Sequence, residues 1–282
     1  MKRTDIAAPA YFHKVVDCQW ACPAHTPVPE YIRLIAAGRY SDAYLVNWKS
    51  NVLPGILGRT CDRPCEPACR RGRVEAGAPP RAADAKPEPV AICRLKRVAA
   101  DFKDDDIATR MPGKAASRNG KRVALVGAGP ASLTVARDLA PLGYECVVFD
   151  QDARAGGMMR AQIPKFRLPD TVIDEECGYI LDMGVEFRGG VRIDSLRALH
   201  AEGFDAIFIG SGAPRGRDLE IPGRREAAKH IHIGIDWLSS VSFGHTTAIG
   251  KRVVVLGGGN TAMDCCRSAR RLGGEDVQVV VR

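Results

Sequence analysis

Two short groups of cysteines in this 282-residue sequence have a residue type and a spacing that suit metal or redox chemistry. Three residues separate the thiols within each group, which comprise Cys18 with Cys22, and Cys61 with Cys65 and Cys69. Pro64 and Pro67 exclude a regular helix in the second group, so these thiols are expected on a loop. Five thiols suffice for one 4Fe–4S cluster, which needs four ligands that are usually cysteine thiolates. Zinc and thiols without a ligand are the alternatives.

A strand, a glycine turn and a helix are predicted just after residue 120. Residues 122–126 are an apolar strand that leads into Gly127 and Gly129. The first glycine permits a tight turn and the second lets the backbone approach a pyrophosphate, at which the following helix points its N-terminus. The next strand ends on Asp150, about 20 residues past the turn, where a carboxylate can bond a ribose hydroxyl. The pattern predicts a dinucleotide site, and a turn without a ligand is the alternative.

The same pattern starts again at Lys251, and its second strand ends at Arg282. An arginine there suits the 2′-phosphate of NADP, whereas an acid would suit NAD or FAD. Between the two patterns, residues 156–158 and 210–213 are glycine turns that could pass close to a flavin, although simple turns would look the same. Cys265 and Cys266 are expected to pack inside a helix.

Composition limits the classes of function. The chain is 45% hydrophobic with a net charge of +8, which could favour an acidic electron carrier or a larger subunit. A basic pattern interleaved with aromatic residues is missing, which argues against a nucleic-acid partner. No apolar run approaches the roughly 18 residues of a membrane span, and the N-terminus lacks a signal-peptide pattern, so we expect a cytoplasmic protein. Ten cysteines there favour metal or redox chemistry over disulfides. The six histidines are scattered, and no catalytic acid, base or nucleophile is predicted.

The predicted fold is α/β: a helical iron–sulfur head followed by two Rossmann-like dinucleotide-binding domains, of which the second is incomplete. We predict a helical 4Fe–4S-binding domain over residues 1–105 and a linker over 106–120. An incomplete dinucleotide-binding domain over 121–245 and the start of a second over 246–282 follow; the family resemblance given below implies that they are the FAD-binding and NADPH-binding domains. Within the head, helices are predicted over residues 28–46 and 90–102.

The order of these motifs resembles a known family. A cysteine-rich head is followed by VGAGPAS, an acid, GGM, IPKFRLP, a GSGA turn and GGGNTAMD. This order is similar to that of the small subunit of NADPH-dependent glutamate synthase and of the matching region of dihydropyrimidine dehydrogenase. The resemblance implies that hydride passes from NADPH to FAD. Single electrons then pass through 4Fe–4S chemistry to a partner, either a large catalytic subunit or a ferredoxin-like acceptor.

The resemblance also implies site residues. For FAD they are Gly127, Gly129, Pro130, Ala131, Ser132, Asp150, Gly157, Met158 and Arg167. For NADPH they are Gly257, Gly258, Gly259, Asn260, Thr261 and Arg282. The candidate cluster ligands are Cys18, Cys22, Cys61, Cys65 and Cys69.

Departures from the family narrow the cluster prediction. Residues 12–15 replace a CxxC pair that the family usually has, so one of its two clusters is expected to be absent or altered. Lys96 stands where the family tends to place a carboxylate or amide ligand, and a protonated lysine cannot bind iron. One cluster is therefore expected, bound by Cys22, Cys61 and Cys65. Its fourth ligand is expected among Cys18, Cys69 and Cys93.

The sequence stops at Arg282, whereas family members continue. A two-stranded remnant would leave an exposed sheet edge and a half-covered apolar face, so either the chain is a truncated product or a second chain completes the fold. Two other functions stay open: the same module serving a different oxidoreductase or ferredoxin, and an inactive binding module. Arginines near the cysteines are either a basic docking rim or ordinary solvated charges.

Overall fold

The computed structural model describes residues 16–74 and 88–281. The segment 12–15 and Arg282, both singled out above, lie outside these ranges. The chain divides into two compact units, residues 1–111 and 112–282. None of the helices in the described residues has the length and apolar character needed to cross a bilayer.

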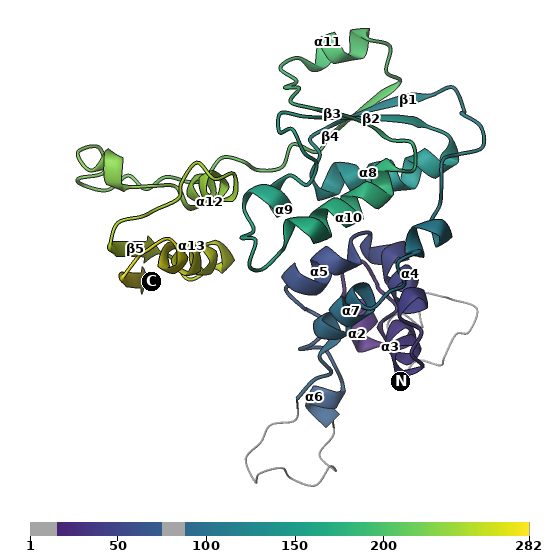
Figure 1. The fold of residues 1–282 in the computed structure, drawn as a ribbon, viewed down its shortest axis with the longest axis horizontal. Coiled ribbons are helices and arrows are strands. Elements are labelled where there is room, and N and C mark those ends of the chain that lie inside the picture. Colours follow the sequence, from purple (N-terminus) through teal and green to yellow (C-terminus); the bar gives the residue numbers. More distant parts are fainter. Residues whose placement is uncertain (1–15, 75–87, 282) are drawn as a thin grey trace, which may run out of the picture. The chain divides into compact units, whose positions relative to one another are not determined.

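Short helices build the first unit (Figure 1). They are α2 (Asp17–Ala21), α3 (Val28–Ala36), α4 (Tyr40–Asn51), α5 (Pro54–Thr60), α6 (Arg71–Val74), α7 (Ile92–Asp101) and the 3-10 turn η1 (Ile107–Arg110). Prolines stand in the first turns of α3 and α5, where a missing N–H costs nothing. Turns replace helix over residues 64–68, as the two prolines predict.

The helix predicted over residues 28–46 is wrong as a single element, because it is interrupted between α3 and α4. Gly38 takes a φ of +72°, a left-handed conformation that ends a helix and that glycine adopts without strain. Its N–H donates to the Ile35 carbonyl at 2.9 Å, and the Arg39 N–H donates to the Leu34 carbonyl at 2.9 Å. Apolar residues continue at helical spacing on both sides of the turn, so the periodicity conceals the break.

The second unit contains a parallel sheet in the order β3-β2-β1-β4. Its strands are β1 (Arg122–Val126), β2 (Glu145–Asp150), β3 (Glu186–Gly189) and β4 (Ala206–Ile209). The helices and 3-10 turns of this part are α8 (Pro130–Leu139), η2 (Ala140–Leu142), α9 (Met158–Ala161), α10 (Asp170–Leu181), α11 (Leu196–Ala201) and η3 (Ala228–His230). Helices α8 and α10 lie on one face of the sheet and α11 on the other (Figure 1). Because both faces are covered, β1 and β2 have continuous apolar cores.

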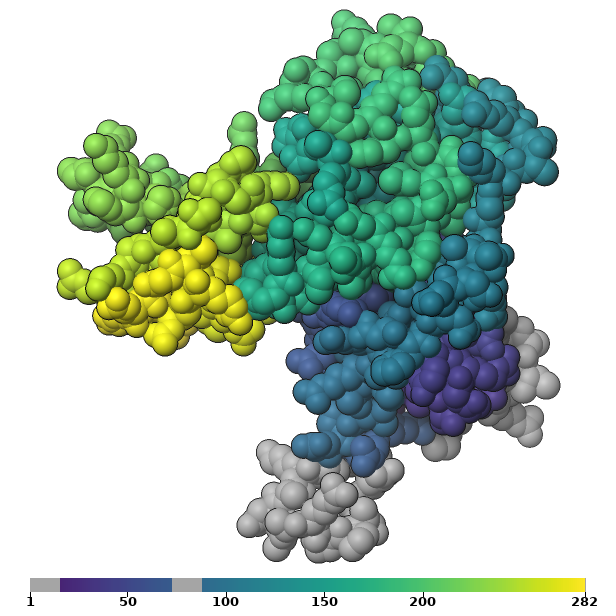
Figure 2. All heavy atoms as spheres, in the orientation of Figure 1, coloured from purple at the N-terminus to yellow at the C-terminus, as the bar shows by residue number. Residues whose placement is uncertain are grey.

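The last part of the unit begins the same architecture again. It contains α12 (Gly234–Ser242), β5 (Arg252–Leu256), α13 (Asn260–Arg271) and β6 (Asp276–Val280). Strands β5 and β6 pair in parallel, and Trp237, Leu238 and Cys265 form a small core with the helices. On these strands and just after them, Val254, Leu256 and Val281 are 61%, 57% and 62% exposed. This apolar exposure was predicted for a two-stranded sheet, and the segment lies at the surface in Figure 2 (yellow).

Candidate cofactor sites

The thiol of Cys22, the residue directly after α2, belongs to a small polar network. Asn51 Nδ2 donates to Thr26 Oγ1 at 2.7 Å, and Thr26 Oγ1 lies 3.3 Å from Cys22 Sγ. Because the threonine oxygen already accepts from the asparagine, its own proton is available for the sulfur. Thr26 is 1% exposed. This network fixes the orientation of Cys22, and neither the threonine nor the asparagine stood out in the sequence.

Packing of α5 against α7 brings Cys61 and Cys93 together. A Cβ atom on Gly58 would lie 2.8 Å from both the backbone N and Cα of Arg97, so the two helices touch where only glycine fits. Cys61 follows the last turn of α5, and its Sγ accepts from the Arg63 N–H at 3.4 Å. Cys93 Sγ lies 3.4 Å from the Gly58 carbonyl oxygen. The two thiols are thus neighbours, although 31 residues lie between them.

The charge of Lys96 acts on three thiols of the head, Cys61, Cys65 and Cys93. A hydrogen bond from Cys93 lowers the pKa of Cys61, with a smaller contribution from Lys96. Burial is the largest cause that raises the pKa of Cys65 to about 11; Lys96 opposes it, and Cys61 and Cys22 add smaller increases. Lys96 is 5% exposed, so its charge acts through a weakly screening interior.

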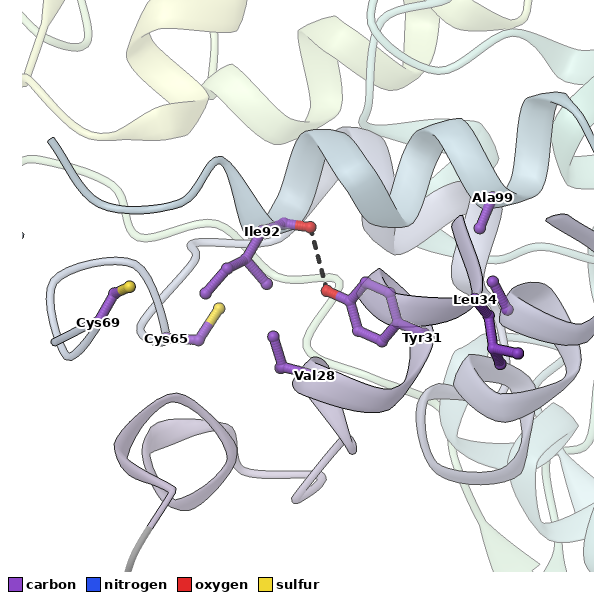
Figure 3. Close-up of a cluster of buried hydrophobic side chains, with 8 residues drawn as sticks. Val28, Tyr31, Leu34, Cys65, Cys69, Ile92 and Ala99 are labelled. Carbon is purple, nitrogen blue, oxygen red and sulfur yellow. Dashed lines mark hydrogen bonds between the residues drawn. The ribbon is translucent and has the colours of Figure 1, made fainter. Parts of the chain in front are cut away.

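Cys18 and Cys69 form a second pair. Burial raises the pKa of Cys18, and Cys69 is the next largest contributor. Both belong to the edge of the core built around Tyr31, whose hydroxyl donates to the Ile92 carbonyl at 3.1 Å. Figure 3 shows Cys65 and Cys69 at this edge, on the loop after α5.

The donor set is suited to a multi-iron cluster. Six reduced thiols lie in the head, and thiolates are the usual ligands of iron–sulfur clusters. In the described residues, no three Cys, His, Asp or Glu side chains are arranged around a single-ion position. In a four-iron cluster each thiolate binds a different iron, so its ligands stand farther apart than those of one ion.

Four arginines of the basic rim considered above form ion pairs within the head. Arg59 and Arg97 both pair with Asp101, at 2.6 and 3.0 Å. Arg70 pairs with Asp17 at 3.0 Å, and Arg63 lies 3.7 Å from Glu66. Three carboxylates of the same unit thus offset most of the charge of these four arginines, so they do not form a purely positive docking surface.

Three glycine segments meet at the carboxyl ends of β1, β2 and β4. A Cβ atom on Gly127 would lie 2.6 Å from the Gly210 carbonyl oxygen, and one on Gly157 would lie 2.8 Å from Gly129 Cα. By contrast, a Cβ on Gly129 would meet nothing within 4 Å. Backbone therefore packs against backbone on two sides, while open space remains in front of Gly129 and the N-terminus of α8. This is the shape that a pyrophosphate requires.

Two of the predicted FAD residues, Asp150 and Ser132, lie against the glycine turns of this cradle. Asp150 Oδ2 accepts from the Ala128 N–H at 2.5 Å, and Oδ1 accepts from the Asp152 N–H at 2.8 Å, so the carboxylate braces the glycine turn. Ser132 is fully buried, and its hydroxyl has no hydrogen-bond partner in the described part of the chain. A Cβ on Gly210 would lie 2.2 Å from that hydroxyl, so the serine side chain faces the GSGA turn.

Arg167 pairs with an acid that sequence reasoning did not select. Its guanidinium donates to Asp264 Oδ2 in α13, which joins IPKFRLP to GGGNTAMD. Phe166 supports the same contact, because the Arg271 guanidinium lies 3.9 Å from its ring centroid. Asp264 is 4% exposed, and burial raises its pKa although Arg167 lowers it. The sequence signal that could have identified Asp264 was its position inside the GGGNTAMD motif.

The Arg167–Asp264 pair gives a prediction for stability. Replacing Arg167 by methionine leaves a buried carboxylate without this cation, so we expect the cofactor-free chain to lose about 2 kcal/mol of unfolding free energy. The folded-state pKa of Asp264 is already raised and should rise further. The loss is therefore smallest at acidic pH, where the carboxyl is protonated, and grows as pH increases through that pKa. Urea unfolding at several pH values measures it.

Adding Asp264→Asn to Arg167→Met serves as the control, because it removes the stranded charge. The double variant should recover most of the lost stability at neutral pH and lose the pH dependence. Equal losses in the single and double variants would contradict the ion pair.

The second glycine turn repeats the first. Gly257 has a φ of +117°, and Gly259 precedes α13 without a side-chain cap. The turn thus combines a left-handed glycine with the N-terminus of a twelve-residue helix between parallel strands. Asn260 and Thr261 start that helix. Cys265 packs in the core beneath it, as predicted, and its thiol lies 3.7 Å from the Gly234 carbonyl oxygen.

Comparison with known proteins identifies the architecture. The model of the pyridine nucleotide-disulphide oxidoreductase family matches residues 121–282, more than half of the chain. The chain belongs to this family. Residues 11–107 match a second model, described as dihydropyrimidine dehydrogenase domain II, 4Fe-4S cluster. The predicted fold class is confirmed. The cofactor prediction is supported as well, because the description of the first model names a pyridine nucleotide and that of the second names a 4Fe–4S cluster.

Curated relatives match nearly the whole chain. The NADPH-Fe(3+) oxidoreductase subunit beta of Geobacter sulfurreducens is 36% identical over 99% of this chain and 41% of its own length. The NADP(+)-dependent formate dehydrogenase subunit beta of Moorella thermoacetica is 34% identical over 94% of this chain and 39% of its own. The glutamate synthase [NADPH] small chain of Escherichia coli K12 is 32% identical over 94% and 56%. The family resemblance is confirmed, and the chain spans less than two thirds of the length of each of these relatives.

Proposed function

We propose that this chain is an electron-input module that passes electrons from NADPH through FAD to a 4Fe–4S cluster and then to a partner enzyme. The observation that carries the proposal is the cradle at Gly127, Gly129 and Gly157, where a side chain would meet backbone on two sides and open space remains on the third. FAD accepts a hydride from NADPH and releases electrons singly, which is the chemistry that a cluster requires.

In this proposal, residues of the chain bind and orient FAD, NADPH and the cluster. Backbone N–H groups at the start of α8 would hold the FAD pyrophosphate, with Pro130 and Ala131 in that first turn. Asp150 braces the turn from below, and Met158 starts α9 directly after Gly157. The turn at Gly257, Gly258 and Gly259, together with Asn260 and Thr261, binds NADPH in the same way, and Arg282 is proposed for the 2′-phosphate. Cys22, Cys61 and Cys65 supply three cluster ligands.

The names of the relatives indicate what kind of partner to propose. The relatives are named as subunits or small chains, and their names include glutamate synthase and formate dehydrogenase. We propose a large catalytic subunit or a ferredoxin-like acceptor, without a nucleic-acid partner. Completion of the C-terminal sheet by further polypeptide is supported by the exposed valines and leucine of β5 and β6. A cytoplasmic location stays a prediction, as does the division into four segments.

An anaerobic visible spectrum tests the proposed function. The purified full chain, supplied with FAD and reconstituted with iron and sulfide, is titrated with NADPH and assayed for bound flavin and iron. We expect the flavin band to bleach, followed by the broad cluster absorbance. Bound iron and flavin with no bleaching by NADPH would instead support the inactive binding module. NADH in place of NADPH is the matched control for the nucleotide.

A further inference from the structure

We propose that Cys93 is the fourth ligand of the 4Fe–4S cluster, beside Cys22, Cys61 and Cys65, because the packing of α7 on α5 places its thiol against Cys61. The inference rests on the proposed function, in which the head carries the cluster. The proposal selects Cys93, in helix α7, from the three cysteines that the sequence left as candidates for the fourth ligand.

Backbone contacts between two helices make the placement of Cys93 rigid. Cys93 stands in the first turn of α7, and Gly58 stands in the last turn of α5. Because a Cβ on Gly58 would overlap the Arg97 backbone at 2.8 Å, the axes approach as closely as glycine allows. Cys93 Sγ lies 3.4 Å and 3.5 Å from the carbonyl oxygens of Gly58 and Leu57. The thiol therefore points at the end of α5 that leads into Cys61.

The cysteine loop also holds Cys93 directly. Glu66 Oε1 accepts from the backbone N–H of Cys93 at 3.0 Å, and Glu66 is the neighbour of Cys65. This bond ties the N-terminus of α7 to the loop, so Cys65 and Cys93 are positioned by a shared contact. Cys93 is 6% exposed and Cys65 is 7% exposed, so both thiols lie in the protected interior that an iron–sulfur cluster favours.

Position separates Cys93 from the other two candidates. Its Sγ lies against the last carbonyl groups of α5, directly before Cys61, and Glu66 ties its backbone to the neighbour of Cys65. Cys18 lies in α2, and Cys69 lies at the far end of the cysteine loop from Cys61. Cys93 is thus the candidate whose thiol is placed against Cys61.

The chemistry of the exchange is simple. Each of the four thiols loses its proton to solvent when its sulfur binds iron, and no electron is transferred. Cys93 Sγ then stops donating to the Leu57 carbonyl, which keeps its helical partner, the N–H of Cys61, at 3.0 Å. Lys96, one turn along α7, lies beside the anionic thiolates and offsets part of their charge.

Ligand variants of the full chain test the assignment. Cys93→Ser, Cys93→Ala and Cys93→Asp are purified anaerobically, reconstituted with iron and sulfide, and compared with wild type by iron and sulfide content and by EPR spectroscopy. We expect the serine and alanine variants to lose about one iron in four and to give a three-iron signal when oxidised. Cys93→Asp, whose carboxylate can bind iron, should keep four irons with an altered spectrum of the reduced cluster.

Cys18→Ser and Cys69→Ser are the matched controls, because they change thiols of the same unit. Both should keep wild-type iron and an unchanged spectrum. Wild-type cluster content in the Cys93→Ser and Cys93→Ala variants would overturn the assignment, as would aspartate being the worst of the three, since a packing role tolerates a buried charge least. Failure of the wild-type chain to bind any iron would overturn the proposed function itself. Circular dichroism melting verifies that each variant is folded.

Discussion

Replacing Gly127 by valine is expected to lower the affinity for FAD by more than about 100-fold, a loss near 3 kcal/mol. The glycine has a φ of +94°, which a β-branched residue adopts only with strain. In addition, the new Cβ would lie 2.6 Å from the Gly210 carbonyl oxygen, a backbone atom that moves only if the end of β4 moves. The variant should also unfold at lower urea concentration. Fluorescence titration with FAD and urea unfolding measure the two effects.

Gly129→Ala is the control that separates ligand approach from folding. Nothing lies within 4 Å of the added carbon, and the φ of −79° suits alanine, so the cofactor-free protein should keep wild-type stability. If the pyrophosphate approaches this backbone as proposed, FAD affinity still falls, because the methyl group occupies the space of the ligand. Wild-type FAD affinity in Gly129→Ala would contradict the proposed approach. Wild-type stability in Gly127→Val would contradict the packing argument.

Replacing Lys96 by methionine is expected to make the midpoint potential of the cluster more negative. The cluster with its thiolates gains a negative charge on reduction, and a nearby buried cation stabilises the reduced state. At an effective dielectric constant of about 20, one such charge contributes about 1 to 2 kcal/mol. This corresponds to about 40 to 90 mV for one electron, or about a tenfold change in the ratio of reduced to oxidised cluster. Anaerobic redox titration followed by EPR measures the shift.

Methionine keeps the length and much of the volume of lysine, so packing in α7 is retained. Lys49→Met is the matched control, since Lys49 is exposed on α4 and solvent screens its charge. A potential that rises or stays unchanged in Lys96→Met would show that the lysine does not act on the cluster. Because Lys96 is 5% exposed, a stability measurement accompanies the titration.

Local chemistry allowed much of this fold to be predicted. The strand and glycine turn at residues 122–129 follow from an apolar run and a glycine that accepts a positive φ. The helix that begins directly after the turn follows from the apolar spacing of its residues. These requirements lie within a few consecutive residues, so sequence reveals them twice in this chain. Turns at Pro64 and Pro67 are equally local, because each proline lacks the N–H that a helix needs. The prediction of one helix over residues 28–46 was wrong because Gly38 adopts a left-handed backbone conformation that ends α3.

Distances between remote residues needed the tertiary structure. Cys93 reaches Cys61 because α5 and α7 touch at Gly58, and no spacing along the chain encodes that crossing. Likewise, Asp264 meets Arg167 only when the two motifs fold against each other, 97 residues apart. Cysteine spacing alone indicated an iron–sulfur head but left three candidates for its fourth ligand. The sequence by itself determined which chemical groups the protein contains and where its two nucleotide turns lie, because both depend on residues that are close together in the chain. Which of these groups act together was decided by helix packing and burial, which depend on residues far apart in the chain.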